Sequence, residues 1–260
     1  MSSLLFLGTG PGNPVPGRFS SSVVLRTPDA CVLVDAGEPC SQRLREAGLP
    51  VASLHAVLVT HGHSDHIGGF PLLMQAAWLE PRSRALPVYL PEELIGPLKA
   101  WLDAVYLPAS LLGFAVDFRP WSAGRTEEVA PGVCVTPFAS THLEGLKKLI
   151  DPSASDRFKV YGLAVETGGQ RVVFSSDLGS PADLAEPLAQ PCDVLVCELS
   201  HFTPEELFGF LRGRQIGELV LTHLSGELAG REEEIVSAAR QALGPSSRVR
   251  VLRDGDEVDF

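Results

Sequence analysis

Short runs of apolar and β-branched residues recur along the whole chain, and Gly, Pro, Asp or Ser residues bound most of them. Runs of this length between turn residues are typical of buried β-strands. The predicted strands are LLFL (4–7), SVVL (22–25), CVLV (31–34), AVLV (56–59), VCV (133–135), VYGLAV (160–165), RVVF (171–174), DVLV (193–196), ELVL (218–221) and RVRVL close to the C-terminal end.

Apolar residues at helical spacing separate some of these strands, near 70–80, 92–107, 204–212 and 230–242. The last of these segments begins in a Glu-rich turn, where acidic side chains stabilise the positive end of a helix dipole. Strands interleaved with helices predict an α/β sandwich, and the early strand-turn-strand pairs add antiparallel hairpins.

No low-complexity tract and no long linker divides the sequence, so we predict one domain over residues 1–260. Two segments are less regular, 108–132 and 143–159. The second follows a candidate metal ligand, and the sequence leaves open whether it is a moving lid or an ordinary surface loop.

The segment VLVTHGHSDHIGG at 57–69 carries the strongest chemical signal. A predicted strand leads into His61, His63, Asp65 and His66, and glycines between and after them let the backbone fold tightly. Imidazole and carboxylate are ligands that zinc accepts readily. A cluster this dense indicates a metal site rather than separately packed core histidines.

Four further candidates follow predicted strands, each directly after a Ser or Thr: His142, Asp177, His201 and His223. In open α/β sheets, ligands bind outside the carboxyl ends of the strands, so we expect one shared site. The remaining histidine, His55, precedes its strand, and we interpret it as an ordinary surface or turn residue.

These residues resemble the metallo-β-lactamase superfamily, and the H-x-H-x-D-H motif at 61–66 carries the resemblance. The resemblance implies an αββα sandwich, with two mixed sheets and helices on their outer faces. It also implies two zinc ions: the first bound by His61, His63 and His142, the second by Asp65, His66 and His223, with Asp177 bridging them.

Two aspartates refine this resemblance. The bridging position holds Asp177 and no thiolate, which is typical of the dinuclear hydrolases of the superfamily. Asp35, in VLVDAG, matches an early aspartate that orients the metal-binding loop in the family, although a plain turn residue is the alternative. Mn²⁺ or Fe²⁺ also suit a His and Asp site.

Within the superfamily the chain looks most like the ribonuclease Z-like phosphodiesterases, because GTGPGNP at 8–14 matches their N-terminal signature. His201 stands where that group carries a histidine thought to protonate the leaving group; a helix-capping or packing role is the alternative. The group's acidic partner is missing, because its position is Val173. Glu198 is a substitute, but three positions along a strand favour opposite faces.

Charge and segment length bear on the substrate. The chain carries 21 basic and 32 acidic residues, a net charge of −11, which opposes binding of large nucleic acids. The segment between His142 and Asp177 is also too short for the tRNA-gripping arm of ribonuclease Z. We therefore expect a small, anionic substrate. A basic cluster either contacts this substrate or is solvated among acidic neighbours; its residues are Lys147, Lys148, Arg157 and Lys159.

The five cysteines form an odd set without framework spacing, and the N-terminal residues include no basic leader and no membrane-spanning run. These features predict a cytoplasmic protein without disulfides or a membrane partner. A homodimer is expected from the family resemblance alone.

The sequence thus predicts a dinuclear-zinc phosphodiesterase that uses a metal-bound hydroxide on a small phosphodiester. Asp65 is the candidate acceptor of the water's proton, and His201 the candidate donor to the leaving oxygen. Two alternatives stay open: a lactone or thioester hydrolase using the same metals, and a metal-binding scaffold that has lost catalysis.

Overall fold

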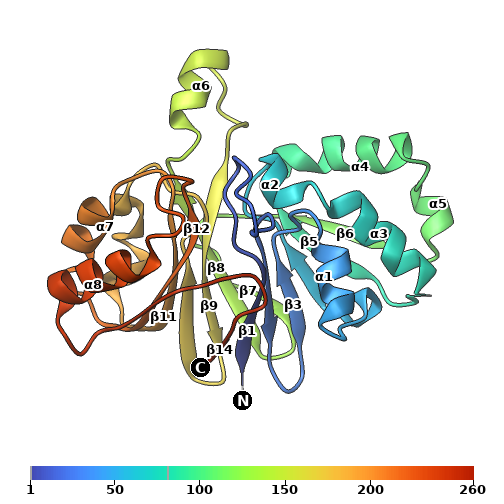
Figure 1. The fold of residues 1–260 in the computed structure, drawn as a ribbon. Coiled ribbons are helices and arrows are strands. Elements are labelled where there is room, and N and C mark those ends of the chain that lie inside the picture. Colours follow the sequence, from blue (N-terminus) through green and yellow to red (C-terminus); the bar gives the residue numbers. More distant parts are fainter. Residues whose placement is uncertain (1, 81) are drawn as a thin grey trace.

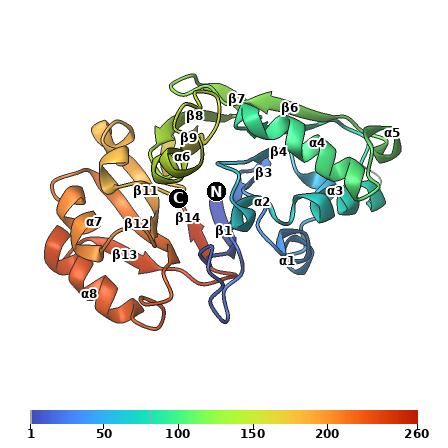
Figure 2. The same cartoon turned by 90° about the horizontal axis from the view of Figure 1, so that it is seen from above.

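The computed structural model describes residues 2–80 and 82–260. Two seven-stranded mixed sheets face each other, in the orders β14-β1-β2-β3-β4-β5-β6 and β13-β12-β11-β10-β9-β8-β7. Helices cover their outer faces, as Figure 1 shows from the side and Figure 2 from above. The αββα sandwich predicted from the sequence is confirmed.

The first half of the chain builds the first sheet, and the last strand joins its edge. Its strands are β1 (Ser3–Gly8), β2 (Ser22–Arg26), β3 (Cys31–Val34), β4 (Ala56–Leu58), β5 (Leu86–Leu90), β6 (Val116–Pro120) and β14 (Glu257–Asp259). Its helices are α1 (Cys40–Glu46), α2 (Ser64–Ile67), α3 (Phe70–Leu79), α4 (Ile95–Ala104) and α5 (Ala109–Leu112), with short 3₁₀ turns η1 (Val51–Ser53) and η2 (Glu92–Leu94).

The second half builds the other sheet with the same pattern of antiparallel strands followed by parallel ones. Its strands are β7 (Glu127–Ala130), β8 (Val133–Ser140), β9 (Val160–Thr167), β10 (Gln170–Phe174), β11 (Cys192–Leu199), β12 (Ile216–Leu224) and β13 (Arg248–Val251). Its helical segments are α6 (Glu144–Ile150), α7 (Pro204–Leu211), α8 (Glu232–Leu243), η3 (Pro181–Leu184) and η4 (Pro187–Ala189).

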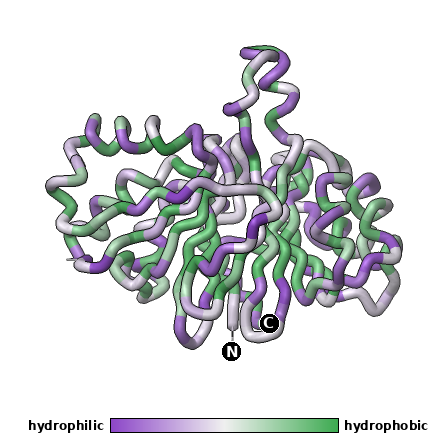
Figure 3. Tube along the Cα trace, turned by 180° about the vertical axis from the view of Figure 1, so that it is seen from behind, coloured by the Kyte–Doolittle hydropathy of each residue, from purple (hydrophilic) through white to green (hydrophobic). Residues whose placement is uncertain are grey.

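Three layers of buried side chains hold the sandwich together. In β1, Leu4 and Phe6 enter the core between the sheets, whereas Leu5 and Leu7 pack toward the helices. A strand buried on both faces needs an unbroken apolar run, which is why the central strands are readable from the sequence. Figure 3 shows these hydrophobic central strands, with more hydrophilic segments toward the outside.

The less regular segments contain more structure than the sequence predicted. Residues 108–132 form α5, β6 and β7, so the expectation of irregular structure there was wrong. Strand β6 is an edge strand with half-exposed and exposed residues, among them Asp117 and Arg119, so it lacks an apolar run. In 143–159 the chain forms α6, which projects away from the body in Figure 1.

No helix within the described residues is both long and apolar enough to cross a membrane.

Candidate metal centre

The candidate ligands come from the carboxyl ends of strands in both sheets and from the segments that follow them; His223 is the last but one residue of β12. His61 and His63 follow β4, and Asp65 and His66 lie in the short helix α2. On the other sheet, His142 follows β8 and Asp177 follows β10, two strands that run in the same direction because each is antiparallel to β9. The site therefore lies at the end of the sandwich where the carboxyl ends of these strands come together.

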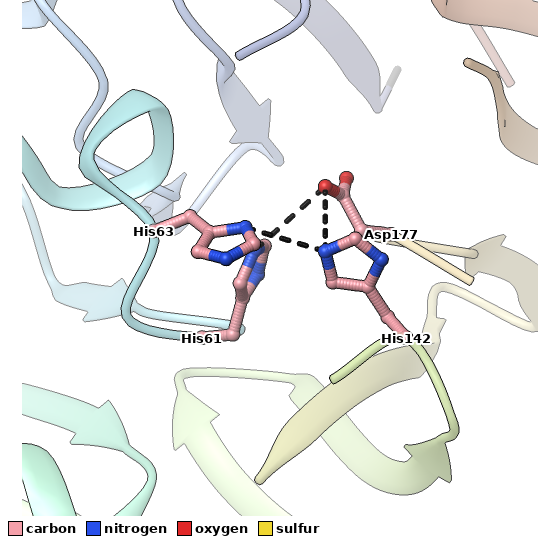
Figure 4. A group of neighbouring side chains, drawn as sticks. All are labelled: His61, His63, His142 and Asp177. Atoms are coloured by element: carbon pink, nitrogen blue, oxygen red, sulfur yellow. Dashed lines mark hydrogen bonds and ion pairs between the residues drawn. The ribbon is translucent and has the colours of Figure 1, made fainter. Parts of the chain in front are cut away.

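The first group consists of His61, His63, His142 and Asp177, whose ligand atoms all lie within 4.8 Å of one another (Figure 4). Nε2 of His142 lies 3.2 Å from Nδ1 of His63 and 3.6 Å from Oδ2 of Asp177. Nε2 of His61 lies 3.7 Å from the same Oδ2 atom. Three imidazoles and one carboxylate oxygen thus face a common point.

The second group consists of Asp65, His66, Asp177 and His223, all of them buried. Nε2 of His66 lies 3.4 Å from Oδ2 of Asp65 and 3.3 Å from Oδ1 of Asp177. Nε2 of His223 lies 3.1 Å from the same Asp65 oxygen and 3.7 Å from the same Asp177 oxygen. Asp177 therefore turns Oδ2 toward the first group and Oδ1 toward the second.

The donor atoms fit a pair of divalent cations. Within residues 2–80 and 82–260, the buried atoms His61 Nε2, His66 Nε2 and Asp177 Oδ1 have no hydrogen-bond partner. Buried polar atoms are nearly always paired in native proteins, so unpaired atoms that face the centres of the two groups indicate sites that bind cations. Imidazole nitrogens and carboxylate oxygens are also the ligand types that zinc accepts.

Burial keeps the imidazoles of the first group in the form that binds metal. It lowers the pKa of His61 well below its ordinary value, lowers that of His63, and lowers that of His142 to about 4. A neutral imidazole presents the lone pair that a metal needs. Burial alone would raise the pKa of Asp177, but His66 and His223 outweigh it and hold that pKa well below the usual range.

The sequence profile of the Beta-lactamase superfamily domain matches residues 30–241, which include every ligand of both groups. The chain belongs to this family.

The chain is also similar in sequence to curated proteins named Ribonuclease Z. The chain is 28% identical to "Ribonuclease Z" of an Exiguobacterium species over 284 aligned positions, covering 90% of this chain and 92% of the relative. Similar coverage is found for "Ribonuclease Z" of Pseudomonas putida strain F1, at 29% identity over 85% of this chain and 84% of that one.

A solved structure agrees in fold. The metallo-beta-lactamase fold protein YhfI from Bacillus subtilis superposes with a TM-score of 0.79 at 20% identity, covering 100% of this chain and 99% of that one.

In this Beta-lactamase superfamily domain, Asp35 connects two ligands from both halves of the H-x-H-x-D-H segment. Its Oδ2 atom lies 2.7 Å from Nδ1 of His66 and accepts from the Thr60 hydroxyl at 2.9 Å. The same hydroxyl lies 3.1 Å from Nδ1 of His61. Sequence reasoning missed Thr60, although a Ser or Thr directly before the first candidate ligand after a strand was the available signal.

His201 and Glu198 lie in contact, and the expectation that they would face opposite ways was wrong. Strand β11 ends at Leu199 and the chain bends, so the three-residue offset is no longer governed by strand geometry. Oε1 of Glu198 lies 2.8 Å from Nδ1 of His201, and its Oε2 accepts from the backbone N–H of His201.

The His201 ring lies beside both ligand groups, 4.4 Å from the His142 ring and 6.1 Å from the His223 ring between centroids. Thr203 caps helix α7 with its own side chain, so His201 is not the cap. Burial alone would lower the pKa of His201, but the hydrogen bond and charge of Glu198 raise it overall.

The basic residues make contacts within their own segment. Nζ of Lys147 lies 3.8 Å from Glu144, and the Arg157 guanidinium lies over the Phe158 ring. Lys148 lies on α6 with Lys147. These contacts favour the solvated interpretation. His55 lies outside the site and accepts from the backbone N–H of Cys31 through Nδ1.

Proposed function

We propose that this chain is a dinuclear-zinc phosphodiesterase that hydrolyses a small phosphodiester. The observation that carries the proposal is the Asp177 carboxylate, whose two oxygens face two separate groups of ligands. A carboxylate shared in this way suits two metal ions that act together on one phosphoryl group.

The family and the curated relatives make the chain a metal-dependent hydrolase. The proposal extends this to two ions, zinc as the metal, and a small diester as the substrate. Support for a small substrate comes from the segment between β8 and β9, whose only helix has 7 residues. A diphosphatase of the PhnP family shares the fold, with a TM-score of 0.73 at 19% identity.

Two bound zinc ions would supply an activated water and would stabilise the negative charge that develops on the phosphoryl oxygens. Asp65 would accept the proton of the attacking water, since its Oδ2 atom lies beside both His66 and His223. The hydrogen bonds of Asp65 with His223 and His66 outweigh burial and lower its pKa, which keeps the carboxylate ionised and able to bind a metal ion.

His201 would protonate the departing oxygen. Its Nδ1 is held by Glu198, which leaves Nε2 for the substrate, and its side chain is 34% exposed, enough to reach a bound molecule. The negative charge of Glu198 stabilises the protonated imidazole, the form that can donate.

The test is turnover of bis(p-nitrophenyl) phosphate by protein whose zinc content has been counted, beside a lactone, a thioester and an RNA substrate. We expect two zinc ions per chain and diester cleavage, with a roughly 100-fold or greater loss in Asp65→Ala. His55→Ala is the matched control, because this histidine lies outside the site.

Each other outcome has a definite meaning. Two zinc ions with rapid opening of the lactone or thioester, and no diester cleavage, would replace the phosphodiesterase with a carboxyl-centred hydrolase. Efficient RNA cleavage would contradict the small-substrate part of the proposal. Two tightly bound zinc ions without turnover of any substrate would support a scaffold.

A further inference from the structure

Asp183 lies outside both groups of ligands, in the short turn η3 that follows Asp177. Its Oδ2 atom accepts from the backbone N–H of Gly179 at 2.9 Å and from that of Thr141 at 3.0 Å. The Thr141 hydroxyl lies 3.0 Å from each carboxylate oxygen, and the Ser140 hydroxyl lies 3.3 Å from Oδ2.

These hydrogen bonds join two loops that carry metal ligands. Thr141 directly precedes His142, and Gly179 lies two positions after Asp177. The Ser140 hydroxyl adds a second connection, because it donates to the backbone carbonyl of Asp177 at 2.6 Å and accepts from the backbone N–H of His142 at 3.2 Å. One carboxylate thus connects the loop after β8 to the loop after β10.

The turn that carries Asp183 is itself firmly anchored. Ser180 caps it by accepting from the backbone N–H of Ala182, and Pro181 and Leu184 are buried on either side of Asp183. A carboxylate fixed at its own backbone can hold other groups in place, because little conformational freedom is left to it.

The close approach of the two loops also requires a residue without a side chain at Gly179. A Cβ atom there would lie 2.1 Å from Oγ1 and 2.7 Å from the carbonyl carbon of Thr141. Any larger residue must push the Thr141 segment away from the loop after Asp177, and His142 with it.

We propose that Asp183 is a positioning residue for the first metal, holding His142 at the distance from Asp177 that the first group requires. The inference rests on the proposed dinuclear site. Asp65, His66 and His223 come from α2 and β12, which Asp183 does not contact through any hydrogen bond described above. Asp177 is shared by both groups, whereas His142 belongs to the first alone. Loss of Asp183 therefore weakens the first metal site more than the second.

The test is a zinc titration against a chromophoric chelator, arranged as two double-mutant cycles. His142→Ala leaves only the second site, and His223→Ala leaves mainly the first. We expect Asp183→Ala to lower zinc affinity about 10–100-fold in the His223→Ala background, as for other residues that orient ligands. In the His142→Ala background the effect should be much smaller, because the ligand that Asp183 positions for the first site is already gone.

Three further variants test whether the hydrogen bonds of Asp183 cause the loss of zinc affinity. Asp183→Asn keeps an oxygen that can accept from both backbone N–H groups, so it should retain most of the affinity that Asp183→Ala loses. Gly179→Ala should reproduce the selective loss by steric displacement. Thr141→Val removes only the hydroxyl bonds and should cause a smaller loss at the same site, which covers the case of an unstable Asp183→Ala.

Asp193→Ala is the matched control. Asp193 also accepts from a backbone N–H, that of Arg171, but it lies at the far end of β11 from the site. Unchanged zinc affinity in both backgrounds for Asp183→Ala and Gly179→Ala would overturn the inference and leave the proposed function standing. Equal weakening of both sites would also overturn it, as a general structural effect. Fewer than two zinc ions in the unaltered protein would refute both.

Discussion

Replacement of His201 by Ala gives the sharpest test of how the site divides its chemistry. The ring nitrogen Nδ1 is engaged by Glu198, so the proposed proton donor is Nε2. His201 forms a third cluster with Glu198 and His223 but belongs to neither group that contains Asp177, so His201→Ala removes the donor and leaves both of those groups complete. The variant should therefore bind zinc normally and fail only where a proton must reach the leaving oxygen.

The magnitude depends on the leaving group. General acid catalysis contributes about 10²–10⁴-fold, which corresponds to about 3–5 kcal/mol of transition-state stabilisation. A p-nitrophenolate ion departs without a proton and should gain little from His201. A more basic leaving group needs the proton, so the full loss should appear there.

The assay is a series of diaryl phosphates from the p-nitrophenyl to the unsubstituted phenyl ester. We expect kcat/KM of His201→Ala to fall only a few-fold for bis(p-nitrophenyl) phosphate and about 100-fold or more for diphenyl phosphate. His55→Ala should match the unaltered protein throughout. The same loss for every ester, with zinc content unchanged, would refute the assignment of His201 as proton donor and indicate a role in binding.

Three further predictions concern other parts of the molecule. Asp35→Asn presents an amide to His66 Nδ1 in place of the carboxylate, which disfavours the tautomer of His66 that binds metal through Nε2. Zinc affinity should therefore fall about 10–100-fold in a chelator competition, and an unchanged affinity would contradict this. Burial raises the pKa of Cys40 to about 12 and that of Cys192 to about 11, and leaves Cys197 fully enclosed. A thiol reagent at neutral pH should therefore label only the half-buried Cys31 and Cys134 until the protein unfolds. Rapid labelling of all five thiols in the native state would contradict this. Arg82 is buried and donates to the carbonyls of Ala52, Leu54, Arg84 and Ala85, so Arg82→Met should lower the free energy of unfolding by about 3 kcal/mol in urea titrations, and a loss below about 1 kcal/mol would show that water replaces these bonds.

The fold could be predicted from the sequence where a strand is buried on both faces, because such a strand is an unbroken run of apolar residues. Strand β11 sends Val194 and Val196 into the core between the sheets and Leu195 and Cys197 toward the helices, so residues 194–197 form an unbroken apolar run. Strand β5 was missed because Pro87 interrupts its run, and prolines usually argue against an inner strand.

The candidate ligands could be predicted because they lie at or just after the carboxyl ends of strands, and these ends lie close together whatever path the loops take. The contacts between loops could not be predicted. Whether Glu198 reaches His201 depends on a bend after Leu199, and whether Asp183 reaches Thr141 depends on the path of a turn. Neither path has a periodic signal in the sequence, because both are set by hydrogen bonds between residues distant in the chain.

Carboxylates behind the site fix the segments that carry the candidate ligands, and this changes how the net charge should be interpreted. His223 is a further example: its backbone N–H donates to Thr9, and Asp254 accepts from both the backbone N–H and the hydroxyl of Thr9. The carboxylates engaged in the site or directly behind it are Asp35, Asp65, Asp177, Asp183, Glu198 and Asp254.

Those six carboxylates lie in the site or directly behind it, and the other 26 acidic residues against 21 basic ones leave a net of −5 for the rest of the chain. Bound divalent cations would offset part of the negative charge of the site. The repulsion of nucleic acid inferred from the whole sequence is therefore overstated, because phosphates respond to charge near the binding surface within about a Debye length. The argument for a small substrate must rest instead on the short segment between β8 and β9, which is why RNA belongs among the substrates tested.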